Sequence, residues 1–418
     1  MTGNFTKKAG QGILKRSLKK QESGFFLAWQ IFQALSHKEP TVTDLYKQDG
    51  VNIPAGDAFS AFVGQLCRES YGNSRFVQVT DLSRGDFRGP RGWRPVDLPD
   101  ECLLTGAMDG IGTKVVLIDA ARTYGDAAND VVAMCAMDIT RYGGLPLVFQ
   151  NIFDVSSLGE VGSETYRHCQ EIMIGLAELA DQHKYVLLTG ETAELGVCVG
   201  SENPDALVRF NWGGSMTGVY HPDKMILGDS VKPGQIIVVF GDTFRSNGIS
   251  SVRKALAKEF GDEWWKNTKA TDAILRCAVP SVQYDRMLNR LHGWFDPLLR
   301  PTVRLHLVTH LSGGAFKGKF GSVLHRLGLT AELDNLFDPP FIMRQCAEWR
   351  GMNSEQCYET WNGGQGALIV IDEPELSLVQ ELAKLCEVDM RVAGRIVPYR
   401  GYTVGLTSRF DGTRVIYP

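Results

Sequence analysis

Residues 162–194 read GSETYRHCQEIMIGLAELADQHKYVLLTGETAE and predict a helix, a short strand and an acidic turn in succession. The apolar residues of the helical part recur at three- and four-residue steps and form one stripe: Tyr166, Cys169, Ile172, Met173, Leu176, Leu179 and Ala180. The run 185–188 then predicts a strand that ends at Gly190-Glu191. Because ligands of α/β sheets bind at the carboxyl ends of strands, this turn is a candidate site.

The same alternation extends in both directions and predicts an α/β fold. Residues 129–137 predict a helix and 147–149 a strand, while 235–240 form a continuous apolar run of the kind that is buried on both faces of a sheet. A helix with one apolar side follows, marked by Ile249, Val252, Leu256 and Phe260. Three segments are expected: an N-terminal extension over 1–44 with a basic start and a short helix at 25–32, a domain over 45–222, and a second domain over 223–418.

Composition limits the class of protein. The 418 residues include 44 Lys and Arg against 48 Asp and Glu, a formal charge of −4, with 44% hydrophobic and 22% charged residues. These values are typical of a soluble globular protein and do not indicate nucleic-acid binding. No apolar stretch approaches the ~20 residues that span a bilayer. The nine cysteines form no C-x-x-C pair, so we expect reduced thiols in a cytoplasmic protein, with no membrane or nucleic-acid partner.

The first chemistry-bearing loop is Gly106-Ala-Met-Asp-Gly-Ile-Gly-Thr-Lys114, which follows a strand-like pair of leucines. Bare backbone at Gly110 and Gly112 lets N–H groups approach an anion, Asp109 suits a hard cation, and Lys114 suits phosphate oxygens. The spacing does not fit a Walker A loop. A glycine turn without a ligand would also explain this stretch.

Two further acidic residues end predicted elements in the same half of the chain. Asp138 closes the helix at 129–137, and Glu191 follows the strand at 185–188. Together with Asp109 they are the oxygen ligands expected around a Mg²⁺–nucleotide. Each alone is also explained as a helix cap or a surface charge.

Three turns in the second half carry polar residues next to glycines: 245–248 (Arg-Ser-Asn-Gly), 310–314 (His-Leu-Ser-Gly-Gly) and 361–366 (Trp-Asn-Gly-Gly-Gln-Gly). The first lies between a predicted strand and a helix, where free N–H groups bind anions. Helix capping would also account for its Ser-Asn pair, and a histidine after a strand, such as His310, is often structural.

The ordered set of motifs resembles the aminoimidazole ribonucleotide synthetase family, the phosphoribosylformylglycinamidine cyclo-ligases of purine synthesis within the PurM-like superfamily. Each motif is short, but together they cover about residues 45–400. The matching segments are 46–56 (YKQDGVNIPAG), 108–114 (MDGIGTK), 133–138 (AMCAMD), 190–194 (GETAE), 246–248 (SNG), 280–281 (PS), 310–314 (HLSGG) and 361–362 (WN).

The resemblance implies a two-domain enzyme whose N-terminal strands pair across a homodimer, with a C-terminal α/β domain packed beside them. It implies a reaction in which ATP and Mg²⁺ activate the formyl oxygen of formylglycinamidine ribonucleotide for ring closure. The implied ATP-binding residues are Asp109, Gly110, Gly112, Thr113, Lys114, Asp138, Glu191 and Thr192, of which Asp109, Asp138 and Glu191 hold the metal. The implied substrate-binding residues are Ser246, Asn247, Gly248, Gly313, Gly314 and Asn362, and the implied catalytic residues are His310, Lys114 and Arg245.

The chain departs from the family pattern at several sites. Arg245 replaces a histidine, Met137 an asparagine, Asn211 a carboxylate and Val282 an arginine, and the glycine-rich loop that covers ATP becomes a basic stretch at 84–94. An arginine does not exchange a proton near neutral pH, but it can strengthen phosphate binding. Three functions therefore stay open: the cyclo-ligase itself, a related enzyme that phosphorylates an oxygen of another small molecule, and a catalytically silent nucleotide-binding subunit.

Overall fold

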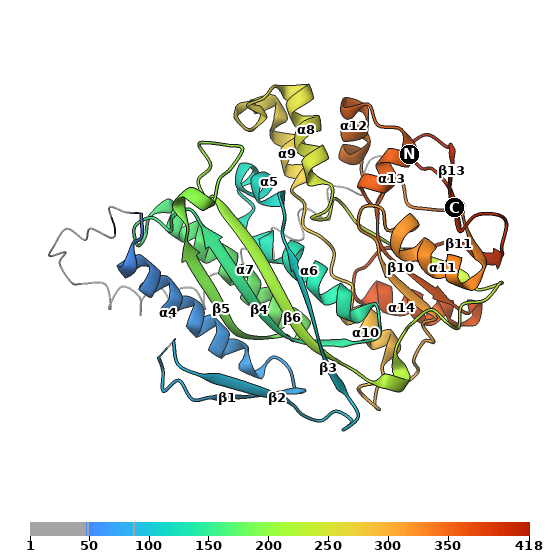
Figure 1. Cartoon of the computed structure of the whole chain (residues 1–418), viewed down its shortest axis with the longest axis horizontal. Helices are drawn as coiled ribbons and strands as arrows, with labels where there is room; N and C mark the ends of the chain where they lie inside the picture. The colour runs from blue at the N-terminus through green and yellow to red at the C-terminus, as the bar shows by residue number, and fades with distance from the viewer. Residues whose placement is uncertain (1–46, 48–49, 87) are drawn as a thin grey trace. The chain divides into compact units, whose positions relative to one another are not determined.

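The computed structural model describes Lys47, residues 50–86 and residues 88–418, and residues 50–418 form one compact unit (Figure 1). The predicted basic start and the short helix at 25–32 lie outside the described residues. Among the described helices, none is both long and apolar enough to cross a membrane.

The first half of this unit is built on a four-stranded sheet with the order β3-β6-β4-β5. Its strands are β3 (Leu103–Gly110), β4 (Leu145–Val155), β5 (Val186–Glu194) and β6 (Phe210–Tyr220). The pairs β3–β6 and β6–β4 are antiparallel, while β4–β5 is parallel. The strands expected at 147–149 and 185–188 are confirmed, but both are longer than predicted. Asp109 and Gly190-Glu191, expected in loops, lie inside β3 and β5 because the ladder continues through their glycines.

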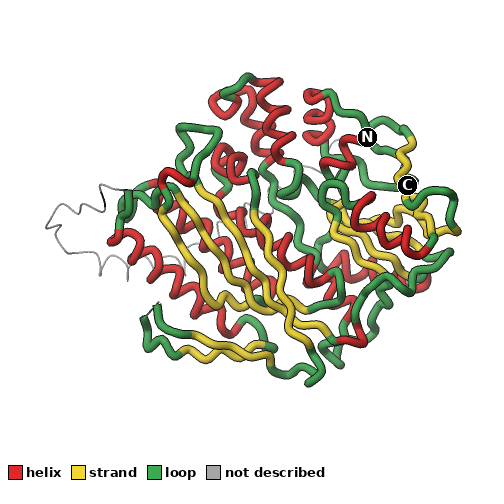
Figure 2. Tube along the Cα trace, viewed as in Figure 1, coloured by secondary structure: helices red, strands yellow, loops and turns green. Residues whose placement is uncertain are grey.

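Two helices, α6 (Ala127–Thr140) and α7 (Glu164–His183), cover one face of this sheet (Figures 1 and 2). The predicted stripe of α7 is confirmed, since all seven of its residues are buried. Ser163 caps the helix by accepting the N–H of Tyr166. Gly175 lies within α7 at a position where no side chain fits, because an added Cβ would stand 1.9 Å from the carbonyl oxygen of Gly125. A glycine within a helix lowers stability by about 1 kcal/mol relative to alanine, but here it allows the two backbone segments to approach closely.

The second half is built on a seven-stranded sheet with the order β13-β12-β9-β11-β7-β10-β8, in which only β12–β9 is parallel. Its strands are β7 (Ile236–Gly241), β8 (Leu307–His310), β9 (Leu329–Leu333), β10 (Gln365–Ile371), β11 (Met390–Pro398), β12 (Val404–Thr407) and β13 (Arg414–Tyr417). The run at 235–240 is confirmed as a strand buried on both faces. Ile237 and Val239 enter one apolar cluster, whereas Ile236, Val238 and Phe240 enter another.

The remaining helices surround these sheets. They are α4 (Ile53–Glu69), α5 (Lys114–Ala121), α8 (Ile249–Phe260), α9 (Thr271–Cys277), α10 (Asp285–His292), α11 (Gly321–Leu327), α12 (Phe341–Arg350), α13 (Ser354–Thr360) and α14 (Leu376–Leu385). Short 3₁₀ turns occur at 70–72, 124–126, 196–198, 222–224, 264–266, 268–270 and 373–375, and residues Phe316–Phe320 form a π-helix. The predicted helix with one apolar side is α8. Its buried residues pack with α5, α9 and α12, so one cluster joins segments from both halves of the chain.

A mixed α/β fold is confirmed. The expected boundary between residues 222 and 223 falls in the connection from β6 to β7, and a division into separate domains stays a prediction. Polar contacts cross between the two halves as well. The indole N–H of Trp294 donates to the carbonyl oxygen of Gly143 at 2.7 Å, and His183 pairs with the buried Asp285 at 3.1 Å.

A two-stranded sheet, β1 (Val77–Asp81) and β2 (Arg91–Pro95), carries the basic stretch. Three of the four arginines in this stretch are engaged locally. Arg94 donates to Gln78 at 2.7 Å, Arg91 donates to the carbonyl oxygen of Gly89 at 3.3 Å, and Arg88 pairs with Asp57. Closure of this stretch over a nucleotide stays a prediction.

Candidate active site

Two carboxylates, Asp109 near the end of β3 and Asp138 near the end of α6, lie close enough for their charges to interact. Asp109 lies opposite Gly214 of β6, and an added Cβ at Gly214 would stand 2.5 Å from the Phe149 ring. This glycine lets α6 approach the sheet, and the Cys135 thiol of α6 lies 3.4 Å from the Gly214 carbonyl oxygen. Burial raises the pKa of Asp109, the N–H of Gly110 lowers it, and the nearby charge of Asp138 raises it further. The predicted pair Asp109 and Asp138 is therefore brought together.

Asp138 has an oxygen without a hydrogen bond. Its Oδ1 is buried and has no hydrogen-bond partner among the residues the structure describes. Two cations stand near it: Arg141 Nε lies 3.4 Å away and Lys319 Nζ 3.9 Å away. A buried carboxylate oxygen of this kind is available to a ligand, and a second carboxylate beside it makes a donor set that hard divalent cations prefer.

Lys319 was not singled out from the sequence. It lies on the π-helix that follows the turn at 310–314, and burial lowers its pKa. The carboxylate of Asp138 opposes this shift, whereas Arg141 and Arg245 add to it. The sequence signal was its position five residues after Gly314, but nothing in one sequence shows that this position faces Asp138.

His310 is the last residue of β8, which is an edge strand of the second sheet, and its side chain is fully buried. Neither ring nitrogen has a hydrogen-bond partner within the described part of the chain. Burial lowers the pKa of His310 well below its usual value, and the charges of Arg245, Lys319 and Arg141 lower it further. The imidazole is therefore neutral near pH 7 and offers one N–H donor and one acceptor, both unused.

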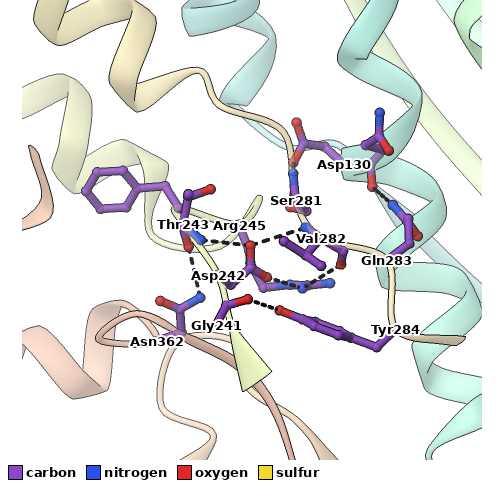
Figure 3. Close-up of polar contacts among 12 residues, drawn as sticks. Asp130, Gly241, Asp242, Thr243, Arg245, Ser281, Val282, Gln283, Tyr284 and Asn362 are labelled. Carbon is purple, nitrogen blue, oxygen red and sulfur yellow. Dashed lines mark hydrogen bonds and ion pairs between the residues drawn. The ribbon is translucent and has the colours of Figure 1, made fainter. Parts of the chain in front are cut away.

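Arg245 is also buried, and hydrogen bonds hold its guanidinium at one nitrogen (Figure 3). Its Nη1 donates to Asp242 Oδ2 at 2.5 Å and to the carbonyl oxygen of Val282 at 3.4 Å. Asp242 Oδ1 accepts the N–H groups of Thr243 and Val282 at 2.8 and 3.2 Å, so the pair is fixed. Nε and Nη2 of Arg245 have no hydrogen-bond partner among the described residues. Two free donors on a permanent charge make this corner suited to an anion.

Gly366 is required by this arrangement. An added Cβ would stand 2.2 Å from both Asp242 Oδ2 and the hydroxyl of Tyr284, which itself donates to the carbonyl oxygen of Gly241 at 2.7 Å. The family's arginine at the position of Val282 is replaced by a residue that contributes only backbone atoms to the Asp242–Arg245 pair.

A narrow cleft beside Arg245 is lined by Phe244, Arg245, Asn247, Ser312, Gly313, Trp361 and Asn362. Four of these residues were predicted from the sequence: Arg245 as catalytic, and Asn247, Gly313 and Asn362 as substrate-binding. Asn362 also joins two loops, because its Nδ2 donates to the carbonyl oxygen of Thr243 at 3.0 Å (Figure 3). Its Oδ1 accepts the N–H of Gly364 at 2.9 Å.

The other predicted substrate-binding residues surround this cleft or support it. Gly248 and Gly314 have φ values of 74° and 71°, a region that favours glycine. An added Cβ at Gly313 would stand 2.3 Å from the carbonyl oxygen of Thr360, so this turn packs closely on α13. The hydroxyl of Ser246 donates to the carbonyl oxygen of Asp130 at 3.2 Å.

Lys114 has a different role from the one predicted. Its ammonium is fully buried, and it donates to Asp130 Oδ1 at 2.7 Å and to the carbonyl oxygens of Phe244 and Val279 at 2.8 Å each. Three acceptors use its three N–H donors, so none is left for a phosphate oxygen. Asp130 Oδ1 also accepts the Ser281 hydroxyl at 2.6 Å. The prediction of a phosphate contact is therefore corrected: in this structure Lys114 joins α5 to the loops of the second half.

Its neighbours in the loop remain near the cleft. Gly112 has a φ of 63°, and an added Cβ there would lie 3.5 Å from the carbonyl oxygen of Ser246. Thr113 precedes α5, and its side chain makes no capping hydrogen bond. Contacts of Gly110, Gly112 and Thr113 with ATP stay a prediction.

Glu191 and Thr192 do not join the acid pair. They lie on β5, and the strand order puts β6 and β4 between them and Asp109. Three spacings of about 4.8 Å separate the two strands by about 14 Å. Within the described ranges no group of three or more His, Cys, Asp or Glu side chains is arranged to hold a metal ion. The structure therefore does not bring the three predicted carboxylates together, and a metal site at Asp109 and Asp138 stays a prediction.

Two other departures from the family pattern have local explanations. Met137 is buried in the apolar cluster that contains Ile236 and Val238, which explains an apolar residue where the family has an asparagine. Asn211 Nδ2 donates to Asp154 Oδ2 at 3.3 Å on the neighbouring strand β4, so the chain keeps a carboxylate nearby.

Comparison with known proteins agrees with this architecture. Residues 95–214, which include Asp109 and Asp138, match the family model described as AIR synthase related protein, N-terminal domain. The phosphoribosylformylglycinamidine cyclo-ligases of Oceanobacillus iheyensis and Staphylococcus carnosus are 26% and 27% identical to the chain. The alignments cover 86% and 88% of this chain and 98% and 99% of those proteins.

Solved structures with a similar fold include thiamine-monophosphate kinase from Stenotrophomonas maltophilia, with a TM-score of 0.53, 16% identity, and coverage of 84% of this chain and 96% of that one. HypE from E. coli has a TM-score of 0.52 and 14% identity, with coverage of 85% and 95%. These likenesses establish a PurM-like fold. The resemblance to the aminoimidazole ribonucleotide synthetase family is confirmed: the chain is a cyclo-ligase-like enzyme, and its residues 95–214 match the model of the N-terminal domain of AIR synthase related proteins.

Proposed function

We propose that this enzyme uses ATP to convert formylglycinamidine ribonucleotide to aminoimidazole ribonucleotide, with release of ADP and phosphate. The observation that carries the proposal is an acid pair, Asp109 and Asp138, beside two cations, since Arg141 Nε and Lys319 Nζ lie 3.4 and 3.9 Å from Asp138 Oδ1. The curated names of relatives aligned over most of the chain support the same reaction. Phosphoryl transfer needs charge neutralisation and positioning more than covalent help, and these residues supply both.

The donor set fits a divalent cation. Asp138 offers a buried oxygen without a hydrogen bond, and Asp109 stands close enough for their charges to interact. Oxygen ligands are what Mg²⁺ prefers, and it often completes its coordination with water and substrate phosphates, so two carboxylates suffice. Bound Mg²⁺ supplies a Lewis acid that neutralises charge on the phosphate oxygens.

The chain's own residues then do two things. Arg245 keeps its charge throughout and holds an anionic oxygen of the substrate with its free Nε and Nη2 donors. His310 is neutral, so one of its ring nitrogens donates a hydrogen bond and the other accepts one. Either bond orients the amidine or formyl group of the substrate. Because Arg245 does not exchange a proton, the proton lost at ring closure passes to another acceptor.

A direct test is to incubate the enzyme with ATP, Mg²⁺ and formylglycinamidine ribonucleotide and to follow aminoimidazole ribonucleotide by its diazo colour. We expect one product molecule per phosphate released. ATP binding without this product would contradict the proposed reaction and favour another small-molecule substrate. Absence of nucleotide binding and of turnover would favour a silent subunit.

We also propose that the enzyme is a homodimer that pairs through the four-stranded sheet. Helices α6 and α7 cover one face of that sheet (Figure 2). The opposite face carries exposed apolar side chains. Leu104, Met108 and Ile152 expose 65%, 76% and 51% of their surface. The register of β3, β6 and β4 puts all three on this face, and such a patch is typical of an interaction surface.

Replacing Met108 and Ile152 together with glutamate is expected to convert the dimer to a monomer, because four like charges would face one another across the interface. Light scattering at micromolar concentration measures this as a halving of the molar mass. Leu385→Glu, an exposed position on α14, is the matched control and should leave the dimer intact. A monomeric wild type, or a double variant that stays dimeric, would contradict the proposed interface.

A further inference from the structure

Because Lys114 does not contact phosphate in this structure, another residue must neutralise the charge of the transferring phosphoryl group. A transferring phosphoryl group carries negative charge that cations must neutralise in the transition state. Lys114 has no free donor, and the free Nε and Nη2 donors of Arg245 are assigned above to an anionic oxygen of the substrate. The geometry next to the acid pair shows which cation can fill the role.

The ammonium group of Lys319 makes no hydrogen bond to any residue that the structure describes. Its nearest carboxylate oxygen, Asp138 Oδ1, is 3.9 Å away, which is too far for a hydrogen bond. About two-thirds of the side chain is covered, since 32% of its surface is exposed. Lys317, two residues earlier, differs in both respects: it is more exposed and its ammonium donates to Glu359 Oε1 at 3.0 Å.

The backbone fixes this position firmly. Phe316 and Phe320 at the two ends of the π-helix are buried in the apolar cluster of the second sheet. A π-helix is rare and occurs often at functional sites. The anchors on either side keep the Lys319 side chain beside Asp138, so its ammonium does not need a hydrogen bond of its own to stay there.

The charges around Lys319 favour an anionic ligand at this place. Arg141 and Arg245 repel its charge, while Asp138 and Asp109 attract it. A divalent cation on the two carboxylates would neutralise that attraction. Lys319 and Arg141 would then lack a nearby anion, and a phosphate group bound at Lys319 would provide one.

We propose that the ammonium of Lys319 binds the phosphoryl group that ATP donates and stays with it until the substrate oxygen has accepted it. This inference rests on the proposed function. In the first step the formyl oxygen forms a bond to the γ-phosphorus, and the bond from that phosphorus to the bridging oxygen breaks, so its electron pair leaves on ADP. In the second step the amine nitrogen bonds to the formyl carbon, the carbon–oxygen bond breaks, and phosphate leaves with that pair. The amine nitrogen and the formamide nitrogen each lose one proton, of which one leaves on the phosphate, and Lys319 keeps all of its own.

The test compares Lys319→Met with Lys317→Met, a matched neighbour on the same π-helix. For Lys319→Met we expect kcat to fall by about 100-fold, the size expected for one donor aimed at developing charge. Calorimetry with Mg²⁺ should show about 10-fold weaker ATP binding and unchanged ADP binding, because ADP lacks the group that Lys319 contacts. KM for formylglycinamidine ribonucleotide should stay the same, and Lys317→Met should resemble wild type in all four measurements.

Three outcomes overturn the inference: equal kcat values for the two variants, equal losses of ATP and ADP affinity, or a loss confined to the KM of the second substrate. Lys319→Arg keeps the charge and should restore part of kcat, which separates loss of charge from local misfolding. Wild-type enzyme that binds ATP but forms no aminoimidazole ribonucleotide would instead contradict the proposed function, and the ATP–ADP comparison would still decide the role of Lys319.

Discussion

Replacing Asp138 with asparagine is expected to reduce kcat/KM for ATP by about 1000-fold, because a metal-held charge contributes several kcal/mol to the transition state. The amide keeps the shape of the side chain but removes the negative charge that a divalent cation needs. Asp138 Oδ1, which has no hydrogen-bond partner within the described residues, is then a neutral oxygen or a nitrogen. Titration with Mg²⁺ should show a weaker apparent affinity, with partial recovery at high concentration.

Asp181→Asn is the matched control for this result. Asp181 lies near the end of α7, is largely exposed and pairs with Lys184, so its loss should leave activity within twofold of wild type. If Asp138→Asn bound Mg²⁺–ATP as well as wild type does, the acid pair would not be the metal site. The charge cluster around Lys319 would then need another explanation.

Replacing Lys114 with methionine is expected to lower the free energy of unfolding by about 3–5 kcal/mol, the loss found when one partner of a buried ion pair is removed. Asp130 would keep its charge in a fully buried position, and the carbonyl oxygens of Phe244 and Val279 would lose their donor. Denaturant unfolding monitored by tryptophan fluorescence measures this loss.

A second change separates the charge from the packing. Adding Asp130→Asn to Lys114→Met removes the unpaired charge and should restore part of the lost stability. Lys258→Met, on the exposed side of α8, should change the stability little. A Lys114→Met protein as stable as wild type, with weakened ATP binding, would instead support the phosphate contact predicted from the sequence.

The fold could be predicted well where burial follows a simple period. The apolar stripe of α7 and the apolar run of β7 each consist of residues of one element that pack in a core. Such residues recur at a fixed spacing within one short segment, so the sequence shows them. The length of β5 could not be predicted in the same way. Gly190-Glu191 resembles a turn in sequence, but the ladder with β4 continues through it.

The candidate site could not be predicted to the same extent, because its geometry depends on contacts between residues that lie far apart in the sequence. Lys114 follows a glycine-rich segment, as a phosphate-binding lysine would, but its partners Phe244 and Val279 lie 130 and 165 residues away. Glu191 has the right chemistry for a metal, but the strand order, which the sequence does not show, separates it from Asp109. Lys319 could not be singled out because its importance comes from facing Asp138, 181 positions earlier in the chain.

The central claim is that this enzyme phosphorylates the formyl oxygen of its substrate before the ring closes. The most direct measurement uses formylglycinamidine ribonucleotide labelled with ¹⁸O in the formyl group, together with unlabelled ATP and water. Mass spectrometry of the released phosphate should find one labelled oxygen for each molecule of aminoimidazole ribonucleotide formed. Unlabelled phosphate, with the ¹⁸O released as water, would contradict the claim and mean that ATP is cleaved without phosphorylating that oxygen.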